Sequence, residues 1–114
     1  MQAVAKAKYL RMSRQKIARV VQLIKGKRVD EALNILHFTP KAAAEPVEKT
    51  LRSAVANLGQ MEEGQRLELH EIQVKNAFVD EGPTLRRFKP MSMGRAGRIR
   101  KRTSHLTVII EERN

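Results

Sequence analysis

The chain of 114 residues contains no cysteine and no tryptophan, and aromatic residues make up only 4% of it. The lack of cysteine excludes disulfide bonds and thiolate metal ligands, and the scarcity of aromatic residues means that any core is aliphatic. No apolar run approaches the ~18 residues that a membrane span requires, and no signal peptide opens the chain. These absences predict a cytoplasmic protein, and the length suits a single domain, since domains cluster around ~100–150 residues.

Acidic residues are absent from two long stretches. The chain carries 23 Lys and Arg against 12 Asp and Glu, a net charge of +11 and a pI near 10.7. Residues 1–29 hold nine basic side chains and no acid, residues 83–103 hold eight and no acid, and residues 30–82 hold five basic and ten acidic ones. Such a charge favours a polyanionic partner such as DNA, RNA or an acidic membrane. The distribution predicts a body with one basic face and a separate basic projection.

Helical periodicity begins after Ser13, whose hydroxyl can cap the free amides of a helix start. Apolar residues then follow at helical spacing, and Gly26 stands where a left-handed C-terminal cap belongs. The stripe consists of Ile17, Val20, Val21 and Ile24. The pattern predicts a helix from Arg14 to Lys25 whose basic residues fall off the apolar stripe. Looser alternation over residues 2–9 predicts a short strand before it.

Two further helices are expected. The second, shorter one carries an apolar face formed by Val29, Ala32, Leu33 and Leu36. Thr39-Pro40 predicts the opening of the third, a capping hydroxyl followed by proline at the first helical position, and that helix ends near Gly59. Pro46 either bends the third helix or marks the start of its regular part at Glu45–Pro46, and the sequence leaves both readings open.

Period-two patterns dominate the C-terminal part of the chain. Apolar residues stand at odd positions up to Leu69 and at even positions from Ile72 onwards, with Phe78 as a possible further member of the second set. This change of phase predicts a bulge near His70–Glu71. A last strand follows at Ser104 to Glu112. Since two strands flank the basic block, the block is expected to form the distal part of a long hairpin with limbs of roughly ten residues.

Sequence patterns give little support to catalysis. The three histidines, His37, His70 and His105, have no metal-ligand spacing and no cysteine partners. The acid pairs lie in polar surroundings, so a buried carboxylate dyad with a shifted pKa is not expected. The stretch Gly94-Arg95-Ala96-Gly97 precedes a strand and not a helix, unlike a phosphate-binding loop. The protein is therefore expected to be no enzyme and to need no metal or cofactor.

The basic block has alternative interpretations. Charge runs often form solvated, disordered tails, but this one is internal, lies between β-rich segments and contains Gly and Pro where turns are needed. Arginine predominates in it and favours bidentate phosphate contacts, so ordered insertion into nucleic acid is preferred. A membrane is the weaker partner because the block lacks an amphipathic face. A free DNA- or RNA-binding regulator using the helices from Ser13 to Leu36 is a second hypothesis, weakened because few side chains beyond Asn34 suit base reading.

Three stretches of the sequence resemble the L-twenty-two family of bacterial large-subunit ribosomal proteins, and the likeness covers nearly the whole chain. They are Lys8-Tyr9-Leu10-Arg11-Met12-Ser13-Arg14-Gln15-Lys16, Asp80-Glu81-Gly82-Pro83-Thr84-Leu85-Arg86-Arg87 and Lys101-Arg102-Thr103-Ser104-His105. The resemblance implies an α+β fold, three helices packed on a small antiparallel sheet with a long projecting β-hairpin. Within a single domain 1–114, we expect a globular body of residues 1–79 and 104–114 and an arm of residues 80–103.

The same resemblance implies a function. It predicts a structural constituent of the large ribosomal subunit that binds large-subunit ribosomal RNA, supports assembly, contacts neighbouring ribosomal proteins, and lines the nascent-peptide exit tunnel with its arm. No membrane and no small-molecule substrate are expected. The residues implied in RNA binding are Lys6, Lys8, Arg11, Ser13, Arg14, Lys16, Arg19, Lys25, Lys27, Arg86, Arg87, Lys89, Arg95, Arg98, Arg100, Lys101, Arg102, Thr103 and His105.

The tip of the arm is expected to face the tunnel and the nascent peptide. Its residues are Lys89, Pro90, Met91, Ser92, Met93, Gly94 and Arg95. Where the family resemblance leads us to expect a basic, alanine-containing run after Pro90, this chain has the apolar and uncharged Met91-Ser92-Met93. That composition suits packing or tunnel-facing contacts better than phosphate binding, so RNA binding is expected mainly along the two limbs.

Overall fold

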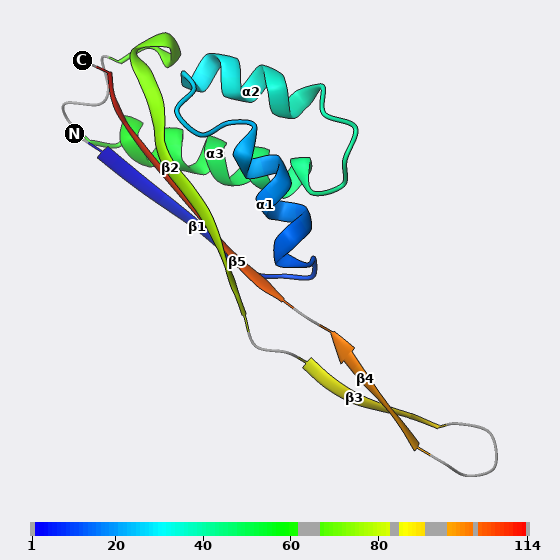
Figure 1. The fold of residues 1–114 in the computed structure, drawn as a ribbon. Helices are drawn as coiled ribbons and strands as arrows, with labels where there is room; N and C mark the ends of the chain where they lie inside the picture. The colour runs from blue at the N-terminus through cyan, green and yellow to red at the C-terminus, as the bar shows by residue number, and fades with distance from the viewer. Residues whose placement is uncertain (1, 62–66, 83–84, 91–95, 102, 114) are drawn as a thin grey trace.

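Three helices cover one face of a three-stranded antiparallel sheet, and a two-stranded hairpin projects beyond the end of that sheet (Figure 1). The structure, a computed structural model, describes residues 2–61, 67–82, 85–90, 96–101 and 103–113. The molecule is elongated, with extents of 65 × 27 × 15 Å. The α+β fold class predicted from the sequence is confirmed.

The sheet is built around its most C-terminal strand. β5 (Ser104–Glu112) lies between β1 (Gln2–Leu10) and β2 (Ile72–Glu81) and pairs antiparallel with both. Its alternate side chains point into the core, and the members of this row are completely buried: Leu106, Val108 and Ile110. Because helices cover only one face, the residues between them face the open side of the sheet.

The first helix is shorter than expected. Ser13 caps α1 (Arg14–Gln22), because its hydroxyl oxygen accepts a hydrogen bond from the Lys16 amide at 3.4 Å. The predicted extension to Lys25 is wrong, because the chain turns towards β2: the Gly26 amide donates to the Val74 carbonyl at 3.0 Å. Gly26 does adopt the expected left-handed conformation, with φ of 75°. The apolar stripe of Ile17, Val20, Val21 and Ile24 is buried as predicted.

The third helix does not open at Thr39-Pro40, and the alternative start at Glu45–Pro46 agrees with the structure within one residue. Thr39 belongs to the end of α2 (Val29–His37), since its hydroxyl donates to the Ile35 carbonyl. α3 runs over Ala44–Gly59, which places Pro46 at its third position. A residue of the first turn needs no amide partner, so Pro46 lies near the start of the helix and requires no bend.

The change of parity before β2 also has a different cause from the one expected. A 3-10 turn, η2 (Leu69–Glu71), occupies the position predicted for a bulge. The bulge lies further along, where Ile110 pairs with Val74 and Ile109 pairs with Asn76, so one residue of β2 is left unpaired. As a result Ala77 is buried and Phe78 is exposed, the reverse of what unbroken alternation predicts.

The basic block forms a hairpin, as expected. β3 (Leu85–Pro90) and β4 (Ala96–Lys101) pair antiparallel, with Leu85 opposite Lys101 at one end and Pro90 opposite Ala96 at the other. Each of these strands has six residues, fewer than the roughly ten expected for a limb. Within the part of the chain that the structure describes, no helix is long and apolar enough to cross a membrane.

Candidate nucleic-acid interface

The predicted RNA-binding cations of the body share two properties. All of them are exposed, and none forms an ion pair with another described residue. They are Lys6 and Lys8 on β1, Arg11, Arg14, Lys16 and Arg19 at and along α1, and Lys25 and Lys27 in the turn after it. Free, solvated cations keep their full charge for an external anion, so this set is suited to phosphate contacts.

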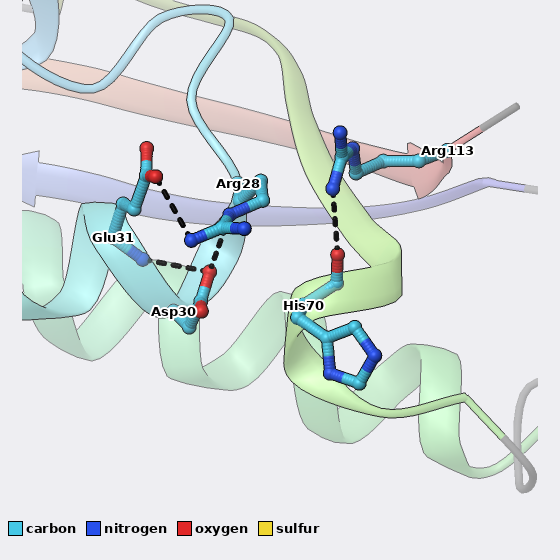
Figure 2. A network of polar contacts seen from close by, with 5 residues as sticks. All are labelled: Arg28, Asp30, Glu31, His70 and Arg113. Atoms are coloured by element: carbon cyan, nitrogen blue, oxygen red, sulfur yellow. Dashed lines mark hydrogen bonds and ion pairs between the residues drawn. The ribbon is translucent and has the colours of Figure 1, made fainter.

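The other described cations of the body, apart from Lys41, have a polar partner within the molecule. Figure 2 shows Arg28 with its Nη2 at 2.9 Å from Glu31 Oε1 and its Nε at 3.3 Å from Asp30 Oδ1. In the same view Arg113 donates from Nη1 to the His70 carbonyl at 3.0 Å. The remaining partnered cations follow the same pattern: Lys49 with Glu45, Arg52 with Glu48 and Lys75 with Glu111. The unpaired cations of β1, α1 and the turn after α1, here called the basic face, thus differ from the cations elsewhere on the body, most of which have a partner within the molecule.

A concave basic site lies at the start of α1. The cavity has a volume of about 550 Å³ and is lined by Arg11, Met12, Ser13, Lys16, Arg19, Lys41, Ala42 and Ala43. The first turn of α1 contains no acidic residue, so the positive end of the helix dipole adds to the field of the cations. Phosphate is the anion that this combination suits best.

Lys41 is the one cation of this cavity that the sequence pattern did not single out. It lies in the acidic middle of the chain, between α2 and α3, and carries no charge signature of its own. Only the folding of the α2–α3 connection against the start of α1 brings it beside Arg11 and Lys16. No local pattern in the sequence could have identified it.

Both ends of the arm meet the body at a packed junction, the arm root, formed by Tyr9, Gly82, Thr103, Ser104 and His105. The Gly82 amide donates to the Thr103 carbonyl at 2.9 Å, and the Ser104 hydroxyl donates to the Met12 carbonyl at 2.7 Å. The Tyr9 amide donates to His105 Nδ1 at 3.1 Å, and the two rings meet edge to face at 4.9 Å. His105 therefore carries its proton on Nε2.

This junction changes the interpretation of two predicted RNA-binding residues. Thr103 is only 2% exposed and His105 is half-buried, so little of Thr103 is accessible to RNA. Tyr9, which was not predicted to be a functional residue, adopts a left-handed φ of 59° at the irregular end of β1. That conformation is uncommon outside glycine, and it aims the Tyr9 amide at the His105 ring.

Gly82→Ala is expected to destabilise the arm root. A Cβ at Gly82 would lie 2.5 Å from Thr103 Oγ1 and 3.1 Å from the His105 ring, so the free energy of unfolding should fall by about 1–3 kcal/mol. Urea unfolding followed by circular dichroism measures this loss. The control is Gly59→Ala, where a Cβ meets nothing within 4 Å and helix propensity predicts a gain of up to ~1 kcal/mol. Equal shifts in the two variants would show that the root tolerates the added methyl.

The arm residues have been placed only in part. Arg86, Arg87, Lys89 and Pro90 lie on β3, and Arg98, Arg100 and Lys101 lie on β4. The remaining predicted arm residues, Met91, Ser92, Met93, Gly94, Arg95 and Arg102, lie outside the described residues. The described part of the chain also contains no group of three or more histidine, cysteine or acidic side chains that could hold a metal ion.

Comparison with known proteins settles the family. Residues 5–111 match the family described as Ribosomal protein L22p/L17e. The chain belongs to this family. It is 54% identical over 112 residues to two curated relatives, both described as "Large ribosomal subunit protein uL22", from Desulfitobacterium hafniense strains Y51 and DSM 10664 / DCB-2. The match covers 98% of this chain and 96% of each relative.

Membership of the L22p/L17e family confirms the resemblance inferred from the sequence motifs and makes the chain a ribosomal protein. It also supports the expectation of a structural protein over an enzyme, independently of any site that the structure contains. The alternative of a regulator that reads DNA with α2 loses ground for a physical reason. The start of α2 carries two acids, Asp30 and Glu31, against the single cation Arg28 that pairs with them, and this negative balance disfavours the phosphates of a DNA groove.

Proposed function

We propose that this chain binds large-subunit ribosomal RNA with its unpaired basic face and with both limbs of its arm, and that the arm tip lines the nascent-peptide exit tunnel. As a member of the L22p/L17e family, the chain is a structural constituent of the large ribosomal subunit, a particle that bacteria use in the cytoplasm. It associates there with ribosomal RNA and with neighbouring ribosomal proteins. The observation that carries the RNA-binding proposal is the separation of free from internally paired cations.

The mode of binding follows from the kinds of residue involved. The body offers exposed lysines and arginines around the start of α1, and the cavity there has four cations, one of them Lys41. Lysine and arginine at such positions neutralise phosphates and fix orientation without reading sequence. Recognition therefore rests on the shape of the folded RNA and the spacing of its phosphates.

The register of the arm supports the same conclusion for the limbs. Arg86 on β3 stands opposite Arg100 on β4, and Leu85 stands opposite Lys101. The register therefore places basic residues of both strands along one short ribbon, and a polyanion beside a ribbon of this charge is favoured. We retain the division into a body of residues 1–79 and 104–114 and an arm of residues 80–103 as part of this proposal, with contact between the tip and the nascent peptide as its most distal element.

Sedimentation with ribosomal subunits tests the assignment directly. A tagged copy of the full chain is expected to travel with the large subunit and not with the small one. Deleting residues 85–97 should leave the body folded, because β1, β2, β5, the three helices and their connections already form one continuous buried core, while lowering incorporation or subunit function. A tagged chain that stays at the top of the gradient would refute the proposed function.

Lys41→Ala is expected to weaken RNA binding in a salt-dependent way. Losing one phosphate contact should reduce the slope of log affinity against log salt by about 0.7–0.9. Filter binding to deproteinised large-subunit ribosomal RNA at several salt concentrations measures the slope. Lys49→Ala is the matched control, because Lys49 is equally a surface lysine but has its Nζ 3.4 Å from Glu45 Oε1. The role of the cavity would be excluded if both variants changed the slope equally.

A further inference from the structure

Phe78 occupies an unusual position for an aromatic residue in a chain with so few of them. Its side chain is 37% exposed, whereas the neighbouring Ala77 is completely buried. The bulge in β2 causes this reversal, because the extra residue between Val74 and Asn76 shifts the alternation by one. Without the bulge, the larger apolar side chain would face the core. Bulges often serve to re-aim a side chain beside a functional site, and here the re-aimed group is a phenyl ring.

A groove lies beside Phe78, between α1 and the edge strand β2. It has a volume of about 320 Å³ and is lined by Arg14, Gln15, Ala18, Val21, Gln22, Lys25, Ala77, Phe78 and Val79. The lining combines a small apolar surface, one aromatic ring, two amide side chains and two cations, and it contains no acid. Few convergent polar groups around an apolar surface are typical of a ligand site.

We propose that this groove binds one unstacked RNA nucleotide, with its base stacked against Phe78 and the adjoining phosphates at Arg14 and Lys25. The inference rests on the proposed RNA-binding function and deepens it, since it adds a specific base contact to phosphate neutralisation. Proteins that recognise RNA away from regular helices stack splayed bases on aromatic side chains. The amides of Gln15 and Gln22 lie in the same groove and offer both donors and acceptors to the base edge.

The charges of the groove favour an anionic nucleotide over an apolar protein segment. Arg14 and Lys25 are the first helical residue of α1 and a residue of the turn that follows it, so they stand towards opposite ends of the groove. Neither forms an ion pair with a described residue. A chain that runs past the ring, with a phosphate on each side of its base, matches this arrangement of cation, aromatic ring and cation.

Substitution of Phe78 tests the stack. Phe78→Leu keeps an apolar side chain but removes the ring, and affinity for deproteinised large-subunit ribosomal RNA is expected to fall about 5- to 150-fold, the range for one base–aromatic stack. The salt slope should stay unchanged, because no charge is lost. Phe78→Trp should retain the affinity of the parent. Phe38→Leu is the matched control, since Phe38 is 77% exposed and is not among the residues that line the groove.

A direct contact can be captured by irradiating the complex at a wavelength that cross-links bases to aromatic side chains. The expected product is a nucleotide attached to Phe78. Binding of Phe78→Leu within twofold of the parent would overturn the inference, as would equal losses for Phe78→Leu and Phe78→Trp, which would indicate a packing role. Loss of subunit incorporation with intact RNA affinity would make the groove a protein contact and would also overturn it. These outcomes leave the proposed function standing, whereas failure of the parent chain to bind the RNA would remove both.

Discussion

Replacing Arg98, Arg100, Lys101 and Arg102 together by alanine is expected to flatten the salt dependence of RNA affinity by roughly three units. Each phosphate contact contributes a slope of about 0.7–0.9 through counterion release, and four contacts on the returning limb account for the total. Three of the four residues lie on β4, the strand that leads back into the body. Filter binding to deproteinised large-subunit ribosomal RNA between 50 and 200 mM salt spans the range in which a multi-contact complex loses most affinity.

The body supplies a matched control for this variant. Arg28, Lys49, Arg52 and Lys75 are also four cations, but each has an acidic partner within the molecule. Their joint replacement by alanine removes the same formal charge and should change the slope far less. If both quadruple variants flattened the slope equally, RNA affinity would depend on net charge alone. That result would contradict a direct contact between the returning limb and RNA.

Leu106→Ala is expected to cost about 2–5 kcal/mol of unfolding free energy. Leu106 is completely buried on the central strand, opposite Ala7 on β1 and Val79 on β2. Because alanine and valine are small, these neighbours cannot fill the cavity that truncation of Leu106 would leave. Since a domain of this length has about 5–15 kcal/mol in total, the variant should be partly unfolded at modest urea concentrations. Urea titration of the full chain, followed by circular dichroism, measures the loss.

Val4→Ala serves as the comparison for the core variant. Val4 is 40% exposed on the open face of the sheet, so its truncation should cost less than about 1 kcal/mol, within the range of strand preferences. Similar losses in the two variants would mean that the open face of the sheet contributes as much to stability as the helix-covered face. That result would contradict the burial pattern.

Sequence patterns predicted those elements whose signal is local and repeated. The apolar stripe that begins at Ile17 identified α1, and period-two alternation identified the strand at Ser104 to Glu112, although not its central place in the sheet. Errors arose where two local interpretations had similar support. Thr39-Pro40 has the chemistry of a helix start, but the Thr39 hydroxyl bonds backwards to Ile35. The turn after α1 is fixed by two hydrogen bonds to a strand about fifty residues away, from the Gly26 amide to the Val74 carbonyl and from the Val74 amide to the Lys27 carbonyl, and no window of the sequence contains both segments.

In the candidate site, too, sequence patterns identified some residues, whereas others join the site only through the fold. Charge runs pointed to the basic residues around Arg14, and the structure leaves these unpaired within its described part. Lys41 joins them only through the fold of the α2–α3 connection. The outward orientation of Phe78 depends on a bulge in β2, and a single extra residue in a strand has no marker in its composition. His105 belonged to a recognised motif, but its contact with Tyr9 spans nearly the whole chain.

The position of β5 sets the order in which this protein can mature during its own synthesis. β1 and β2 pair only with β5 and not with each other, so neither edge strand has a partner until residues 104–112 have been made. The basic arm, residues 80–103, is also synthesised before this central strand. Contacts across such separations close slowly. The newly made helices, which end at Gly59, are therefore available to chaperones, or to precursor RNA, before the sheet that holds them together exists.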